Sequence, residues 1–67
     1  MMFIKLIFVG GEPTYVNINH ITRIYKAVIG TYVCFHGDDY IKVKESPEEI
    51  YNRIQKYRGE LWHLMTE

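Results

Sequence analysis

Hydrophobic and polar residues alternate along several short segments of the chain, which is the pattern of β-strands with one buried face. The alternation is clearest where Val16 and Ile18 fall on one side and Tyr15 and Asn17 on the other. Other segments rich in Ile, Val, Phe and Tyr precede and follow it. The pattern predicts five strands, at about residues 2–9, 14–18, 21–27, 31–36 and 40–45.

Turn residues separate the predicted strands. Gly10-Gly11-Glu12-Pro13 and Gly37-Asp38-Asp39 are both suited to hairpin turns. Asn19-His20 interrupts the alternation before the third strand. Ile21 and Ile24 are three residues apart, so a flat strand cannot bury both side chains. We therefore expect a bulge or a short helical turn at this point.

A helix start follows the fifth strand. Ser46 can cap the helix, Pro47 suits its first position, and Glu49 completes a capping box with Ser46. Gly59 either ends the helix or lies within it. The sequence predicts a helix over about residues 47–58, with an extension to about residue 65 left open. One apolar stripe follows its length, formed by Ile50, Ile54, Tyr57 and Leu61.

These elements predict a single α+β domain over residues 1–67: a twisted antiparallel β-sheet of four to five strands with one C-terminal helix packed on one face. One helix covers only one face of such a sheet, so the second face stays uncovered. The strand tyrosines fall mostly opposite the inward Val and Ile residues. The predicted uncovered face carries Tyr15, Tyr25, Tyr32, Cys34, Tyr40, Lys42 and Lys44.

The short chain limits the hydrophobic core. Domains of about 60 residues bury a small fraction of their surface and are commonly stabilised by disulfides, a metal or association. Cys34 is the only cysteine of the 67 residues, so no disulfide forms within the chain. We also predict no metal site, as argued below. Self-association is then the remaining means of stabilisation, and we expect a dimer or a higher closed homo-oligomer.

The apolar N-terminal segment is interrupted by Lys5 and followed by the Gly10-Gly11 turn. It lacks the basic leading region and the small-residue cleavage site of a signal peptide. It is also far shorter than the ~20 residues that a membrane span needs. We therefore expect a strand at this position, a cytoplasmic protein and no membrane insertion.

Three segments carry a family resemblance: residues 3–6 with the following glycine turn, residues 16–24, and residues 40–50. The most specific part is Val43-Lys44-Glu45-Ser46, followed by Glu49 and Ile50. In order and spacing these segments resemble the FlbD family of small flagellar and swarming motility proteins. The resemblance implies a link to flagellar motility, a flagellar or envelope-associated protein partner, and no catalytic residues or cofactors.

Cys34 and His36 are two residues apart on a predicted strand, so their side chains would share a face. A zinc site normally needs four ligands, and the chain offers no second cysteine and no matched spacing among its three histidines. A nucleophilic cysteine needs a base, an orienting group and an oxyanion site. We interpret both residues as ordinary strand and turn residues, and predict no catalytic, cofactor-binding or metal site.

The tyrosines give the main indication of function. The chain contains six of them, and a contiguous aromatic face on a small domain is typical of a contact surface. Cross-strand packing of the rings is the structural alternative. The sequence predicts a non-enzymatic protein-interaction or assembly module that self-associates. Its expected interaction surface contains Tyr15, Tyr25, Tyr32, Tyr40, Lys42 and, in the apolar tail, Trp62.

A nucleic-acid-binding sheet is the alternative function. It would stack bases and hold phosphates with Tyr15, Tyr32, Tyr40, Lys5, Lys42 and Lys44. The eight basic and eight acidic residues give a net charge of zero, whereas nucleic-acid-binding proteins usually carry a basic excess. Nucleic acid is therefore the less favoured partner.

Overall fold

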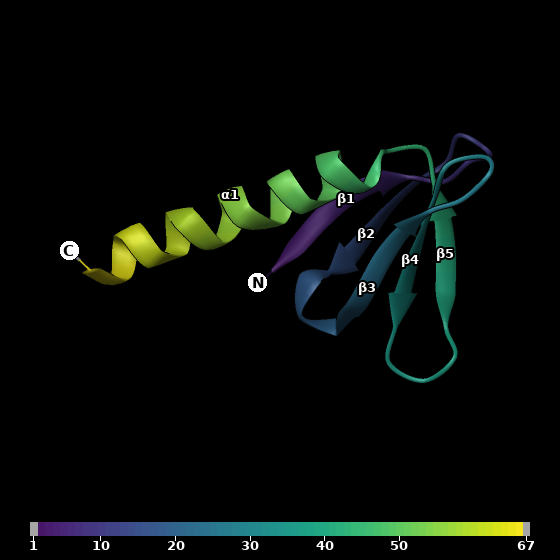
Figure 1. Ribbon diagram of the computed structural model, residues 1–67. Helices are drawn as coiled ribbons and strands as arrows, with labels where there is room; N and C mark the ends of the chain where they lie inside the picture. The colour runs from purple at the N-terminus through teal and green to yellow at the C-terminus, as the bar shows by residue number, and fades with distance from the viewer. Residues whose placement is uncertain (1, 67) are drawn as a thin grey trace.

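The computed structural model describes the backbone of residues 2–66 and the side chains of residues 2–59. The fold is α+β, with the strands first and a long helix last, as the sequence predicts (Figure 1). The elements are β1 (Phe3–Ile7), β2 (Pro13–Asn17), the 3-10 helix η1 (Ile18–His20), β3 (Ile21–Lys26), β4 (Thr31–Phe35), β5 (Tyr40–Val43) and α1 (Pro47–Thr66).

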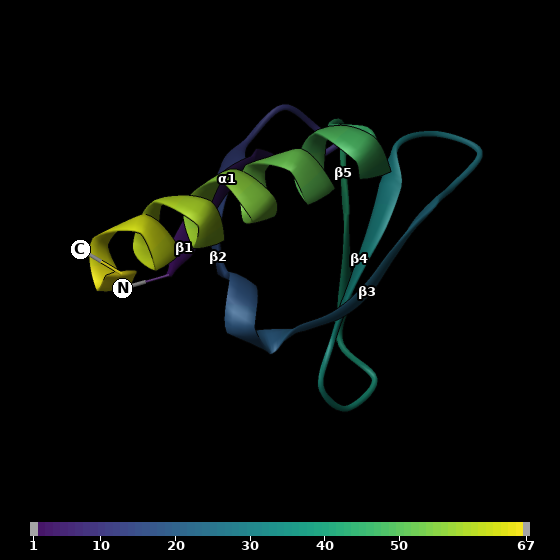
Figure 2. The ribbon, with the colours of Figure 1, turned by 60° about the vertical axis from the view of Figure 1, so that its left-hand side comes forward.

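The strands form two antiparallel sheets, so the predicted single sheet of four to five strands is wrong. One sheet contains β1 and β2, and the other has the order β3-β4-β5. The two sheets meet at one end, where Phe8 forms an isolated bridge with Val43. Beside this bridge the Val9 N–H donates to the Lys42 carbonyl at 3.1 Å, and the Lys44 N–H donates to the Ile7 carbonyl at 2.8 Å. Away from that junction the sheets diverge (Figure 2).

The shape of the core explains why the sheet divides. Buried side chains come from both sheets, from η1 and from the first turn of α1. A flat five-stranded sheet would offer a single helix more surface than it can cover, whereas two sheets folded toward each other enclose one centre. Ile54 and Tyr57 of α1 pack against this centre. The core residues are Ile4, Leu6, Val16, Ile18, Val33, Val43 and Ile50.

The start of β3 contains the expected irregularity. The register with β4 shifts between Ile21, which faces Phe35, and Arg23, which faces Cys34. Because of this bulge, Ile21 and Ile24 both pack against the core despite their spacing of three residues. Of the two irregularities expected between Ile21 and Ile24, the structure contains the bulge, and the 3-10 helix η1 lies before Ile21.

Helix α1 begins with the predicted capping box. The Glu49 N–H donates to the Ser46 hydroxyl at 3.1 Å, and the Ser46 N–H donates to the Glu49 carboxylate at 3.3 Å. The helix then continues through Gly59, which has no positive φ and does not end it. Its 20 residues span about 30 Å, and its C-terminal part extends beyond the strands (Figure 1). Among the described residues, no helix has the length and apolar character that crossing a membrane requires.

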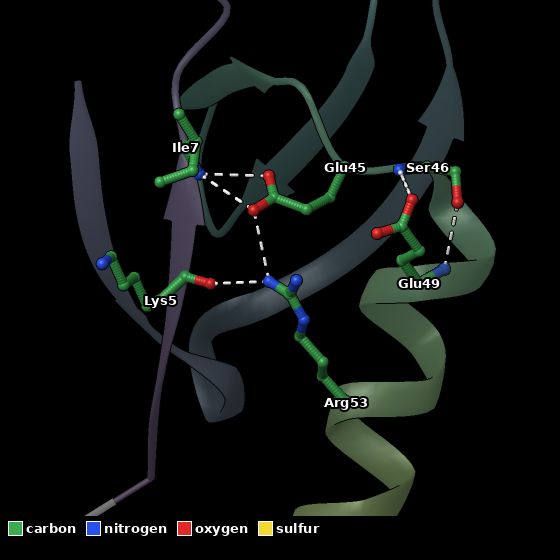
Figure 3. Close-up of polar contacts among 6 residues, drawn as sticks. All are labelled: Lys5, Ile7, Glu45, Ser46, Glu49 and Arg53. Atoms are coloured by element: carbon green, nitrogen blue, oxygen red, sulfur yellow. Dashed lines mark hydrogen bonds and ion pairs between the residues drawn. The ribbon is translucent and has the colours of Figure 1, made fainter. Parts of the chain in front are cut away.

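A buried carboxylate occupies the gap between β1 and α1 (Figure 3). Glu45 is 8% exposed, and its two oxygens accept from the Ile7 N–H at 3.0 and 3.2 Å. Arg53 donates to Glu45 at 3.2 Å and to the Lys5 carbonyl at 2.9 Å. Glu45 and Arg53 thus satisfy the Ile7 N–H and the Lys5 carbonyl of β1 beyond the end of β5, which removes the need for a longer ladder between β1 and β5.

Candidate interaction surface

The outer side of the second sheet gathers aromatic and cationic side chains. Residues that face each other across antiparallel strands share a side of the sheet. Arg23, Cys34 and Tyr40 form one such row across β3, β4 and β5. Tyr25, Tyr32 and Lys42 form the adjacent row on the same side. We call the two rows together the tyrosine face: Arg23, Tyr25, Tyr32, Cys34, Tyr40 and Lys42.

Three tyrosine rings on this face are in contact with one another. The ring centroids of Tyr25 and Tyr32 are 5.2 Å apart with a tilt of 34°, and those of Tyr32 and Tyr40 are 5.4 Å apart in an edge-on arrangement of 72°. These are the separations and angles that attract aromatic side chains to each other. Tyr32 therefore links one ring from each neighbouring strand into a continuous aromatic strip.

Two cations lie on the faces of these rings. The guanidinium carbon of Arg23 is 5.1 Å from the Tyr25 ring centroid, and the Lys42 ammonium nitrogen is 5.0 Å from that of Tyr32. Both distances are within the range of a cation–π interaction. These cations and the cross-strand contacts favour the observed orientations of the rings.

The tyrosine face is open, because the core and α1 lie on the opposite side of this sheet. Tyr25 is 44% exposed and Tyr40 is 62% exposed, whereas Val33 on the inner side is fully buried. A hollow of about 470 Å³ lies over the face and continues onto the β4–β5 turn, where it is lined by Asp38 and Asp39. The face therefore has an acidic border at this end.

One residue of the expected interaction surface, Tyr15, does not join the tyrosine face, and another, Trp62, lies outside the described side chains. Tyr15 lies on β2 opposite Lys5, in the other sheet, where its side chain is 66% exposed. It lines a separate hollow together with His20 and His36. The backbone at Trp62 belongs to α1, but its side chain is outside the described residues.

The structure does not bring Cys34 and His36 together in one hollow. Cys34 is half-buried on the tyrosine face, whereas His36 lies beyond the end of β4 and lines the second hollow. Within the part of the chain that the structure describes, no three His, Cys, Asp or Glu side chains gather as a metal site would require.

The sequence analysis did not include Arg23 in this surface. The bulge at the start of β3 sets the alternation of the strand, so that Arg23 and Tyr25 point to the same side. Strict alternation counted backward from Tyr25 would have identified Arg23. The acidic border was missed because Asp38 and Asp39 were interpreted only as turn residues, and the position of that turn beside the rings depends on the tertiary structure.

A scan against protein-family models gives a match to the family described as flagellar and swarming motility proteins, over residues 2–61. The chain belongs to the FlbD family. The match includes all five strands, the whole tyrosine face and most of α1. Searches among curated proteins and among solved structures found no significant match. Membership of the FlbD family links the chain to motility and confirms the resemblance inferred from its sequence.

Proposed function

We propose that this FlbD-family chain is a non-enzymatic protein-interaction module that self-associates through the tyrosine face. One observation carries the proposal: Tyr32 contacts both Tyr25 and Tyr40, and the three rings form a strip on the side of the sheet that the helix leaves uncovered. Tyrosine and arginine are enriched in protein interfaces, and aromatic anchors often supply much of the binding energy.

The ring contacts favour binding because they restrict the side chains in advance. Association normally costs entropy when long side chains become fixed at an interface. Tyr32 already contacts a ring on each side and a cation above it, so less freedom remains to be lost. The net charge of zero also limits repulsion between copies of the chain.

The family membership supports a setting for this module. The family description concerns flagellar and swarming motility, and we extend that link to this chain. In this proposal the assembled module acts in the cytoplasm and presents its remaining surfaces to a protein of the motility system.

Nucleic-acid binding is less well supported by the geometry. Lys42 lies over the Tyr32 ring, which occupies a face that a base would need for stacking. Asp38 and Asp39 border the same hollow and would repel phosphate groups. The tyrosine face therefore favours a protein surface over a nucleic-acid strand.

Sedimentation velocity over a series of protein concentrations tests the self-association. We expect the wild-type chain to shift from monomer toward dimer, and the double variant Tyr25→Ser/Tyr40→Ser to remain largely monomeric. Tyr15→Ser is the matched control, because Tyr15 is similarly exposed but lies on the other sheet. A wild-type monomer at every concentration, or a double variant that dimerises like the wild type, would contradict the proposal.

Fluorescence anisotropy with labelled single-stranded DNA and RNA at low salt tests the alternative. We expect a flat titration. Binding that weakens steeply with added salt and is lost in Tyr32→Ser would instead favour the nucleic-acid function.

A further inference from the structure

We propose that two copies of the chain pack tyrosine face to tyrosine face with their strands antiparallel, so that the Asp38–Asp39 turn of each copy faces Lys42 and Lys44 of the other. The inference rests on the proposed self-association and specifies its geometry. It is carried by the arrangement of charges along β5, which separates an acidic end from a basic end.

The acidic end lies where β5 begins. Asp38 and Asp39 are exposed, and both line the hollow over the tyrosine face. The Phe35 N–H donates to the Asp39 carbonyl at 2.9 Å, which fixes the turn against the end of β4. The two carboxylates are therefore held at one border of the face.

The basic end lies where β5 finishes. Lys42 lies on the tyrosine face, and Lys44 follows β5 in a bend directly beyond Val43. The Lys44 N–H donates to the Ile7 carbonyl at 2.8 Å, which ties this bend to β1. Lys44 is exposed, Tyr32 lies level with Lys42, and Tyr40 lies between the lysines and the acidic turn along the sheet.

Symmetry then selects one arrangement. A two-fold axis that runs along the strands would superpose like ends, acidic over acidic and basic over basic. An axis across the strands reverses them and places β5 of one copy over β5 of the other. β5 runs from Tyr40 to Val43, with the Asp38–Asp39 turn before it and Lys44 directly after it. An axis level with the middle of β5 therefore places the acidic turn of each copy over the lysine end of the other, twice by symmetry.

Charge reversal at each end tests this arrangement. Asp38→Lys/Asp39→Lys makes both ends of the face basic, and Lys42→Glu/Lys44→Glu makes both ends acidic. We expect each variant alone to self-associate about tenfold or more weakly than the wild type, because every altered contact occurs twice. An equimolar mixture of the two should form a heterodimer at least as tight as the wild-type dimer. Added salt should weaken that heterodimer.

Lys26→Glu/Lys56→Glu is the control for net charge, since both lysines are exposed and neither belongs to the tyrosine face. It should dimerise like the wild type. If either charge-reversed variant fails to fold by far-UV circular dichroism, Asp39→Asn and Lys44→Gln replace them, and each should weaken the dimer.

The outcomes separate the two proposals. Charge-reversed variants that dimerise normally, with no preference for the mixture, overturn the antiparallel arrangement and leave the tyrosine-face dimer standing. Loss of dimer in the Lys26→Glu/Lys56→Glu control also overturns the arrangement. Normal dimerisation of Tyr25→Ser/Tyr40→Ser overturns the proposed function itself. Preferential heterodimer formation supports both.

Discussion

At the scale of single residues, the junction between the two sheets depends on a glycine and a carboxylate. Gly30 has a φ of +81°, and a Cβ atom there would meet the Val43 carbonyl oxygen and the Val9 side chain. Glu45 accepts from the Ile7 N–H, beside the Ile7 carbonyl that accepts from Lys44, and from Arg53. Gly30 leaves room for the Val43 carbonyl, and Glu45 accepts from a backbone N–H that would otherwise need a partner strand.

Gly30→Ala should therefore destabilise the fold severely. The left-handed backbone alone costs about 1–2 kcal/mol for alanine, and the clash with the Val43 carbonyl raises the total to ~3 kcal/mol or more. Gly37→Ala is the control, because Gly37 has a φ of +79° but nothing within 4 Å of its Cβ position. Urea unfolding would measure both, and equal losses would show that the close approach at Gly30 is unimportant.

Glu45→Ala should lower the free energy of unfolding by about 2 kcal/mol, because the Ile7 N–H and the Arg53 guanidinium both lose an acceptor. Glu45→Gln should cost less, since its amide oxygen can still accept from Ile7. Glu48→Ala, an exposed change in the first turn of α1, should stay within about 0.5 kcal/mol of the wild type. A Glu45→Ala variant as stable as Glu48→Ala would contradict the role assigned to the buried carboxylate.

At the scale of elements, local sequence sets the residue at which α1 begins, and packing against the core sets the orientation of its first half. The capping box satisfies backbone donors at Ser46 and Glu49. Ile50, one turn after Ser46, is fully buried, and Ile54 and Tyr57 continue the contact with the core. The helix orientation follows from this stripe, because its apolar side has to face the two sheets.

Ser46→Ala should remove one acceptor of the capping box and cost about 1 kcal/mol, with the loss of helical signal beginning at the N-terminal end of α1. Ser46→Asn should recover most of that stability, because its side-chain oxygen can also accept from the Glu49 N–H. Thermal unfolding followed by circular dichroism measures both. No difference between the two variants would show that the cap contributes nothing.

At the scale of the whole molecule, a small core coexists with a large open aromatic face. Among the described side chains, seven hydrophobic residues form the buried cluster. On the other side of the second sheet, Tyr25 and Tyr40 remain substantially exposed. Covering this face with a second copy would extend the apolar contacts of a chain whose own core is limited by its length.

Coupling between association and folding should make thermal stability depend on protein concentration. If the dimer is the stable form, the midpoint should rise on the order of 5 °C for each tenfold increase in concentration. Tyr25→Ser/Tyr40→Ser should remove this dependence, while Tyr15→Ser should preserve it. Differential scanning calorimetry over two decades of concentration measures the slope, and a wild-type midpoint independent of concentration would contradict the coupling.

The sequence by itself determined the local features of this protein. The capping box places the start of α1 at Pro47, and the three-residue spacing of Ile21 and Ile24 predicts an irregularity, which in the structure is the bulge in β3. Alternation likewise separates Tyr32 from Val33 on opposite sides of β4. These features depend on neighbours within a few residues, where backbone geometry and side-chain periodicity leave few choices. The same segments also carried the resemblance to the FlbD family.

Only the tertiary structure decided how the strands divide and which tyrosines meet. Strand pairing depends on partners distant in sequence, and alternation says which side a residue faces but not which sheet contains it. Glu45 illustrates the point: its carboxylate reaches Ile7, 38 residues away, where a longer sheet would have continued. Because β1 and β2 separate from the other strands, Tyr15 is removed from the face that Tyr25, Tyr32 and Tyr40 share.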